Sequence, residues 1–288
     1  MMKIYDKNVP NTVWRILAGV GLVLLLSGLL YAGVLCWAWL SDLKHADIAR
    51  EIIDPKAAEY ISQAYPDNDY VLDNAYYVFK DNCYRVNVHS PSSQDTYFKL
   101  DYDYKTYELV RDDYESSVLS GYNTRNRLVS AYTQLINDCL SSATCLSRVS
   151  SDFCQYSENI SHGGYFSPNG LDSQTLVVDQ AYNVAELGAA YGFLEVTAVL
   201  PKEEVNIRSA LTILTEIDHL LAESSIGYSI IEITIVDAEY PDATAKFYLY
   251  DVHPEDLDWE DAIAHLQEKW SEQESHRQAL QEEWDVVT

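Results

Sequence analysis

The cysteines have the clearest capacity for chemistry in this sequence, because a thiol can form a disulfide, bind a metal ion or act as a nucleophile. Beyond residue 40 there are four of them, Cys83, Cys139, Cys145 and Cys154. In an exported region they allow two disulfides in three possible pairings. The gaps of five and eight residues between the last three fit no zinc pattern with paired cysteines. We interpret the four as structural cysteines, either free or disulfide-bonded, and expect no metal site.

Histidine, serine and glycine do not fall into a spacing that marks an active site. The seven histidines are scattered, and the sequence contains no His-Glu-x-x-His motif. It also contains no Gly-x-Ser-x-Gly motif and no phosphate-binding glycine loop. We therefore predict no catalytic residue and no cofactor.

Carboxylates supply the one enzymatic alternative. Asp101, Asp103 and Asp113 lie close together in the sequence and could serve an exported hydrolase that acts on wall material. Such an enzyme needs two carboxylates about 5 to 10 Å apart, one of them with a raised pKa. The pattern Asp101-x-Asp103 also offers oxygen ligands to calcium, but it does not continue into a calcium-loop motif.

The overall charge restricts the class of partner. The formal net charge is −26 at pH 7, and residues 1–40 hold only four charged side chains, so nearly all of the negative charge lies beyond them. A field of this sign repels phosphate backbones, which excludes nucleic acid as a partner. With 48% hydrophobic and 12% aromatic residues, the composition is typical of a folded protein.

An uncharged apolar run near the N-terminus predicts a transmembrane helix. Residues 16–40 carry no charge, and about 20 residues of helix suffice to cross the hydrocarbon core. Trp14 precedes the run and Trp37 and Trp39 lie near its end, at the depths that tryptophan rings prefer. We predict a transmembrane helix over residues 13–40 with these three tryptophans at the membrane interfaces. The alternative, a cleaved signal peptide, has a shorter apolar region that ends in small residues.

The positive-inside rule does not decide the orientation, because three basic residues precede the run and Lys44, Arg50 and Lys56 follow it. A first apolar segment with a short basic tail normally inserts with that tail inside. We therefore expect a cytoplasmic tail over residues 1–12 and a juxtamembrane linker over 41–54. The remainder is expected outside the plasma membrane, held by a single span.

A first α+β domain is predicted over residues 55–140. Asp54 and Pro55 are typical of a helix start, and the helix is expected to end near Ala64. Strict alternation of apolar and polar residues then predicts an antiparallel meander of about four strands. Helical spacing predicts a further helix that covers this sheet. The strands are expected around residues 83–89 and 98–104, with hairpin turns at 81–82 and 105–106, and the covering helix over 125–140.

A second α+β domain is predicted over residues 171–258, after a linker or long loop over 141–170 that is rich in serine, glycine and asparagine. The expected order is strand, helix, two strands, with helices on one face. These elements are expected over residues 194–200, 201–222, 231–235 and 246–250, followed by a C-terminal helix and tail over 259–288 with Asp258 as its cap. The fold class is thus α+β: one N-terminal transmembrane helix and two small domains, each an antiparallel sheet with helices.

A set of short motifs suggests a family. They are Ala57-Ala58-Glu59-Tyr60, Tyr65-Pro66, Tyr84-x-Val86, Ser92-Ser93-x-Asp95-x-x-Phe98 and Asp113-Tyr114. In these the chain resembles the YfjL-like family, uncharacterised membrane-anchored proteins of Gram-positive bacteria with a small exported domain. The cysteines between 139 and 154 depart from that pattern. The family has no established activity, so the resemblance implies a topology and no catalytic residue. The helix-plus-meander arrangement is also similar to PepSY-like and cystatin-like modules, which mostly bind or restrain partners.

These observations favour a non-enzymatic binding or regulatory module at the cell surface. Its expected partners are the membrane, through residues 13–40, and another envelope protein or a wall component. Tyrosines are enriched in binding sites, and Tyr76, Tyr77, Tyr97 and Tyr102 are the candidates in the first sheet. The wall-directed hydrolase remains the alternative.

Overall fold

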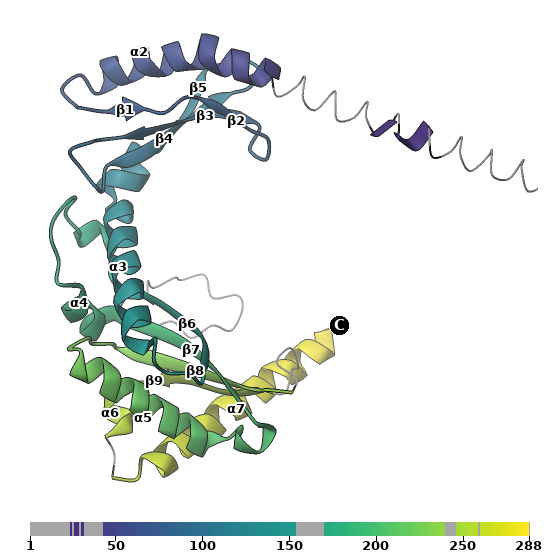
Figure 1. The fold of residues 1–288 in the computed structure, drawn as a ribbon, viewed down its shortest axis with the longest axis vertical. Coiled ribbons are helices and arrows are strands. Elements are labelled where there is room, and N and C mark those ends of the chain that lie inside the picture. The colour runs from purple at the N-terminus through teal and green to yellow at the C-terminus, as the bar shows by residue number, and fades with distance from the viewer. Residues whose placement is uncertain are drawn as a thin grey trace, which may run out of the picture. The chain divides into compact units, whose positions relative to one another are not determined.

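The computed structural model describes residues 24, 26–28, 30, 31, 43–153, 170–239, 246–258 and 260–287. The chain forms two compact units (Figure 1). Unit 1 consists of Met1–Ser92 and Tyr97–Asp113, and unit 2 consists of Ser93–Thr96 and Tyr114–Thr288. Both units combine β-sheet with helices, which confirms the mixed α+β class.

The sheet of unit 1 is antiparallel, as its alternating sequence predicted. The order β1-β3-β4-β5 gives its main path, and β2 also pairs with β3. Hairpin turns at the predicted positions join β2 to β3 and β4 to β5. The strands are β1 (Val71–Leu72), β2 (Tyr76–Val78), β3 (Cys83–His89), β4 (Tyr97–Asp103) and β5 (Leu109–Asp112).

The helix of unit 1 begins earlier than predicted. Residues 43–48 are helical, a π-helical turn over Ala49–Ile53 follows, and α2 (Asp54–Ala64) continues directly from it. Asp54 is therefore not the cap: Ile53 before it is already helical, and the Asp54 Oδ1 atom instead accepts a hydrogen bond from the Ala75 N–H at 2.7 Å. Most of the predicted linker 41–54 is thus helix.

The core of unit 1 lies between α2 and one face of the sheet (Figure 1). The helix buries Ile53, Ala57 and Ile61, which are spaced four residues apart and so share one face. The strands bury Tyr84, Val86, Val88, Phe98, Leu100 and Tyr102, which are cross-strand neighbours on β3 and β4. The opposite face of the sheet carries the polar residues of the alternation.

The sheet of unit 2 has the order β6-β7-β8-β9, and one of its pairings corrects the predicted antiparallel sheet. The pairs β6 with β7 and β8 with β9 are antiparallel, but β7 and β8 are parallel. The reason is the helix between them, since a parallel pair needs a long crossover connection. The strands are β6 (Leu146–Phe153), β7 (Gly192–Leu200), β8 (Ile230–Asp237) and β9 (Lys246–Val252).

Helix α3 (Tyr122–Leu140) ends where predicted, begins three residues earlier than the predicted 125, and belongs to unit 2. Its buried Leu128, Tyr132 and Ile136 share one core with residues of β7 and β8 such as Leu194 and Ile231. The predicted domains 55–140 and 171–258 are therefore incorrect at their boundary, because the chain passes into unit 2 after Asp113. Helical periodicity identified the apolar face of α3, but not the sheet against which it packs.

Part of the predicted linker 141–170 is also structured. Residues 146–153 form β6, whose Ser150 and Ser151 hydroxyls donate hydrogen bonds to Glu195 and Thr133. These serines indicated a loop by composition, but they serve an edge strand. Residues 154–169 of that linker lie outside the described part of the chain.

The other helices of unit 2 are α4 (Val184–Tyr191), α5 (Ile207–Glu223), α6 (Pro254–Leu257) and α7 (Ala262–Val287). Helix α5 begins later than predicted because Asn206 caps it, accepting hydrogen bonds from the N–H groups of Arg208 and Ser209. Asp258 does not cap the last helix. It ends α6, and Asp261 accepts a hydrogen bond from the Ala264 N–H at the start of α7.

Helix α7 also supplies hydrogen-bond partners to the backbone at the edge of β9. The Gln273 side-chain amide accepts a hydrogen bond from the Tyr250 N–H at 3.1 Å and donates one to the Tyr250 carbonyl at 2.8 Å. It thereby reproduces the pairing of a neighbouring strand. Stacking of Trp270 on Phe247, with ring centroids 5.6 Å apart, holds the same part of the helix against the strand.

Candidate functional site

The face of the unit 1 sheet opposite α2 is the first candidate site, and we call it the polar face. Cross-strand pairing brings its side chains together in a ladder. Its members are Tyr76, Arg85, Asn87, His89, Tyr97, Lys99, Asp101 and Arg111. Tyr76 and Tyr97 are 43% and 45% exposed, so this face presents two aromatic rings to solvent, Tyr76 opposite Arg85 and Tyr97 opposite His89.

An array of ion pairs fixes the centre of the polar face. Arg85 forms a two-pronged contact with Asp101, with Nε–Oδ1 at 2.7 Å and Nη2–Oδ2 at 2.9 Å, and a further contact with Asp81 at 3.1 Å. Arg111 binds Asp113 through two nitrogens and approaches Asp101 to 4.0 Å. The hydrogen bonds that Arg85 donates to Asp101 raise the pKa of its guanidinium further. The array is therefore charged and held in one geometry.

The three aspartates of the hydrolase alternative are all occupied in this arrangement. Asp101 and Asp113 are buried against the arginines. Asp103 accepts hydrogen bonds from the N–H groups of Thr106 and Lys105 at 2.8 and 2.9 Å, and these bonds lower its pKa. Each of the three aspartates thus has ionic or hydrogen-bonding partners of its own within unit 1.

The four candidate tyrosines divide into two groups. Tyr76 and Tyr97 are exposed on the polar face, as a binding role requires. Tyr77 and Tyr102 point to the other face, where Tyr102 is 2% exposed and belongs to the core. Period-two alternation places neighbouring residues on opposite faces, so adjacent tyrosines 76 and 77 separate.

An aromatic cluster joins the first helix of unit 1 to the β2–β3 hairpin. The His45 ring stacks on Tyr77 with centroids 3.8 Å apart and planes 6° apart. His45 Nδ1 also lies 2.7 Å from the hydroxyl oxygen of Tyr84, which is fully buried. Burial raises the pKa of Tyr84 to about 12, so its hydroxyl remains protonated and available as a donor.

The cysteines follow the free-thiol alternative as far as they are described. Cys83, Cys139 and Cys145 are free, and Cys154 lies outside the described residues. Cys139 Sγ lies 3.3 Å from the Leu220 carbonyl oxygen, so it has a structural contact. Burial raises the pKa of Cys83 and Cys145, which disfavours the reactive thiolate.

The predicted membrane segment falls mostly outside the described residues, and so do Trp14, Trp37 and Trp39. Within residues 13–40, those that are described are helical, and Leu24, Leu30 and Tyr31 are strongly exposed. In the described part of the chain, no helix has both the length and the apolar character to cross a membrane.

A pair of carboxylates that the sequence did not reveal lies in unit 2. Glu195 on β7 and Glu232 on β8 are direct partners in the parallel pairing, so their side chains share one face of the sheet. Burial, Glu195 and Asp251 together raise the pKa of Glu232 to about 7. The signal that could have found this pair is the matched position of glutamate in two Ile- and Val-rich strands, but only the strand register shows that they meet.

The described residues do not bring together three His, Cys, Asp or Glu side chains in an arrangement able to hold a metal ion. A separate cluster, centred on Asp256 after β9, joins this carboxylate to a histidine and a lysine. Asp256 accepts contacts from His265 Nε2 at 2.8 Å and Lys269 Nζ at 2.9 Å. It joins α6 to α7 and is a structural contact.

Comparison with known proteins adds little to this geometry. No family model matches the chain, and no curated protein matches it. A crystal structure of a DUF5037 family protein from Ruminococcus gnavus ATCC 29149 is similar to 71% of this chain over 84% of its own, with 13% identity and a TM-score of 0.20. A likeness at that TM-score carries no argument. The resemblance to the YfjL-like family stays a prediction.

Proposed function

We propose that the chain is a membrane-anchored, non-catalytic binding protein that presents the polar face of unit 1 to a protein of the cell envelope. The observation that carries this proposal is that two exposed rings lie on the face that holds the Arg85–Asp101–Arg111 array: Tyr76 pairs with Arg85, and Tyr97 lies at the other end of β4. Aromatic rings supply contact area, and arginines and carboxylates in fixed geometry supply specificity. The apolar run over residues 16–40 supports the anchor.

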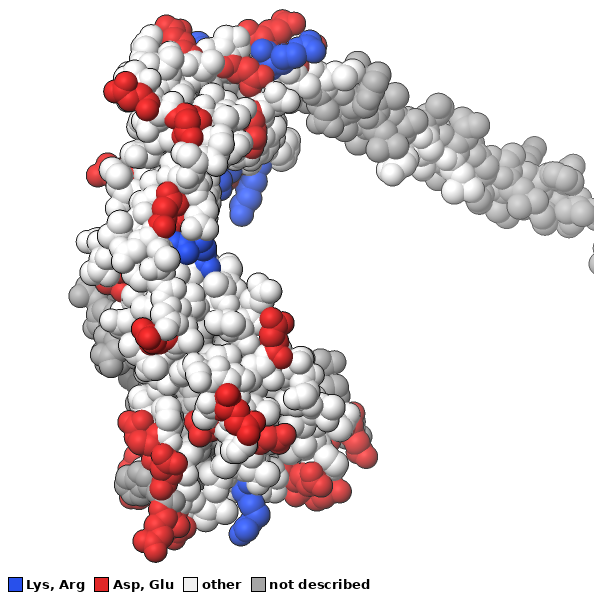
Figure 2. Space-filling model, turned by 60° about the vertical axis from the view of Figure 1, so that its left-hand side comes forward, with Lys and Arg blue, Asp and Glu red and all other residues white. Residues whose placement is uncertain are grey.

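Charge favours a partner with basic groups. Figure 2 shows many acidic side chains on the face that it presents, in line with the net charge of −26. A basic protein surface would be drawn to such a molecule over several ångströms. Association should therefore weaken as salt is added.

A crosslinking experiment on intact cells tests the proposal. A crosslinker that cannot pass membranes is applied, the chain is recovered, and attached proteins are identified by mass spectrometry. The wild type is expected to yield a reproducible protein adduct, which Tyr76→Ala and Tyr97→Ala reduce at least fivefold. Tyr122→Ala is the matched control, because Tyr122 is 52% exposed but lies in unit 2. An adduct that all variants retain equally would reject the polar face, and crosslinking only after lysis would reject the outward orientation.

The Glu195–Glu232 pair favours a second candidate, the wall-directed hydrolase. A carboxyl group with a pKa near 7 holds a proton in part of the molecules at neutral pH, as a general acid requires. If this candidate is correct, the wild type releases soluble fragments from purified cell wall and Glu232→Gln abolishes the release. Glu203→Gln, at an exposed position, should leave it unchanged. Failure of the wild type to release fragments rejects this candidate.

A further inference from the structure

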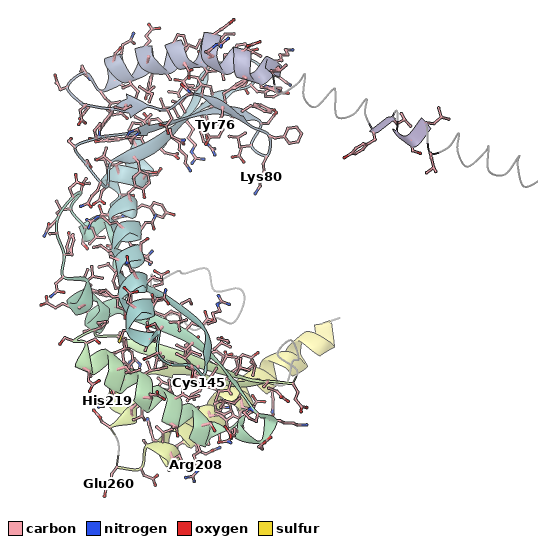
Figure 3. The ribbon with its side chains drawn as sticks, in the orientation of Figure 1. Tyr76, Lys80, Cys145, Arg208, His219 and Glu260 are labelled. Atoms are coloured by element: carbon pink, nitrogen blue, oxygen red, sulfur yellow. The ribbon has the colours of Figure 1, made fainter. Side chains whose placement is uncertain are left out.

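The tip of the β2–β3 hairpin, residues 79–82, presents an apolar ring to solvent. Phe79 is 88% exposed, although burial of a phenylalanine side chain away from water is favourable. Lys80 beside it is also exposed, and Figure 3 shows this side chain at the end of the hairpin, directed away from the sheet. An exposed ring next to a cation is the combination that suits the boundary between lipid and water, where the amine reaches the headgroups.

The hairpin is fixed to the part of the chain that follows the apolar run. Tyr77 stacks on His45, and Phe79 contacts Tyr77 edge to face with ring centroids 6.4 Å apart. The Tyr77 hydroxyl also donates a hydrogen bond to Asn82 Oδ1 within the tip. Phe79 is thus separated from the His45 ring by a single aromatic side chain.

Chain length sets the distance between this cluster and the predicted membrane surface. The apolar run ends at Leu40, five residues before His45. Five residues span about 7 Å as helix and at most about 18 Å when fully extended. The headgroup region on each side of the hydrocarbon core is about 5 to 8 Å thick. The tip therefore lies close to the outer headgroup layer if residues 16–40 span the bilayer.

The charges at the tip are compatible with a phospholipid surface. Asp81 is the acidic residue of the tip, and Arg85 Nη2 lies 3.1 Å from its carboxylate. This contact partly offsets the negative charge that would repel phosphate groups, since Arg85 also pairs with Asp101. Lys80 remains as the exposed cation beside Phe79.

We propose that the hairpin tip is a second membrane contact, in which Phe79 inserts among the phospholipid headgroups and Lys80 binds their phosphates. This inference rests on the proposed membrane anchor. Unit 1 is then attached to the bilayer at two points. One is the transmembrane helix that precedes it in the chain, and the other is the hairpin tip. Together they hold unit 1 in a fixed orientation on the bilayer.

Photochemical labelling in a bilayer tests the inference on the full chain. The photoreactive residue p-benzoylphenylalanine replaces Phe79, the protein is placed in nanodiscs of phosphatidylcholine and phosphatidylglycerol, and lipid adducts on the tip peptide are measured by mass spectrometry after irradiation. The position is tolerant, because its side chain is almost fully exposed. Val71 is the matched control: it is an exposed apolar residue that pairs with His89, at the opposite end of β3 and about 20 Å from the tip.

We expect at least tenfold more lipid adduct at position 79 than at position 71. Equal labelling at both positions, or no labelling at 79, overturns the inference. Extraction with alkaline carbonate separates this failure from failure of the anchor. A chain that stays in the membrane without labelling at 79 is anchored but has no second contact, whereas a chain that is extracted lacks the anchor itself, and the inference fails with it.

Discussion

At the scale of single residues, the hydroxyl of Tyr102 is an imperfection in the core of unit 1. It is buried, and among the described residues it has no hydrogen-bond partner. Burial raises the pKa of Tyr102 to about 12. An unsatisfied buried hydroxyl costs about 1 kcal/mol or more relative to a phenyl ring of the same shape.

Tyr102→Phe is therefore expected to increase the free energy of unfolding by about 1 kcal/mol. Tyr84→Phe is the matched comparison, because Tyr84 is equally buried but its hydroxyl bonds to His45 at 2.7 Å. That variant should lose about 1 kcal/mol. Urea unfolding measures both values, and a destabilising Tyr102→Phe would show that the hydroxyl has a partner after all.

Glu232 gives a prediction about pH. Its folded pKa of about 7 lies above the ordinary 4.5, so between these values the folded chain holds a proton that the unfolded chain has lost. The contribution of this group to the free energy of unfolding is greatest at low pH and falls as pH rises through about 5 to 8, by about 1 to 3 kcal/mol in total. Glu232→Gln should remove this part of the pH dependence. Urea titrations at pH 5 and pH 8 measure it, with Glu203→Gln as the exposed control; an unchanged pH profile in Glu232→Gln would contradict the raised pKa.

At the scale of elements, the contact between Gln273 and the edge of β9 is a substitute for a strand. Gln273→Ala leaves the N–H and carbonyl of Tyr250 without this partner. We expect a loss of about 1 to 2 kcal/mol and faster hydrogen exchange at the Tyr250 amide. Gln267→Ala is the control, since Gln267 is exposed on the same helix. Equal exchange rates in the two variants would mean that the edge is protected by something other than the Gln273 amide.

Much of the element pattern could be read from the sequence, because periodicity is a local property. Alternation identified β3, β4, β8 and β9, and the apolar stripe identified α5. Helix α4 was missed because it is short, and β6 because its apolar residues do not alternate and its register shifts near Leu146. These local signals do not show which elements pair or pack together. The parallel pairing of β7 with β8 and the packing of α3 against the second sheet were therefore not predicted.

For the candidate sites, too, the sequence predicts which face a residue takes but not which residues it meets. Exposure of Tyr76 and Tyr97 follows from alternation, whereas the contact of Arg85 with Asp101 depends on the register set by the β3–β4 pairing. The Glu195–Glu232 pair depends on the register of two strands separated by a whole helix. Local patterns determine which face a residue takes, but the neighbour across the sheet is a tertiary property.

At the scale of the whole molecule, the segment Ser93–Thr96 is part of unit 2 although it connects β3 and β4 of unit 1. Asp95 is fully buried and accepts two hydrogen bonds from Arg127, at 2.6 and 2.9 Å, and one from the Asp179 N–H. Asp179 in return accepts from the N–H groups of Gln94 and Asp95. Burial alone would raise the pKa of Asp95, but the bonds from Arg127 and Asp179 outweigh it and lower the pKa.

Asp95→Asn is expected to lower the free energy of unfolding of unit 2 by about 3 kcal/mol, because it leaves Arg127 without its buried counter-charge. A lowered folded pKa means that the wild-type contribution is present above the ordinary pKa of aspartate, about 4, and is lost as pH falls below it. The variant should therefore show a smaller loss of stability on acidification. Asp138→Asn, at an exposed position on α3, is the control.

The same contact predicts that the part of unit 2 from Tyr114 onward depends on the segment Ser93–Thr96, which lies earlier in the chain. A chain that begins at Tyr114 contains every strand of the second sheet but lacks Asp95, so Arg127 and Asp179 lose their buried partner. Its β7 and β8 amides should exchange hydrogen faster than in the full chain, to the same degree as in full-length Asp95→Asn. If the shortened chain exchanges as slowly as the wild type, the Asp95 contact contributes nothing to unit 2. If it exchanges faster than Asp95→Asn, other residues of the first 113 also stabilise unit 2.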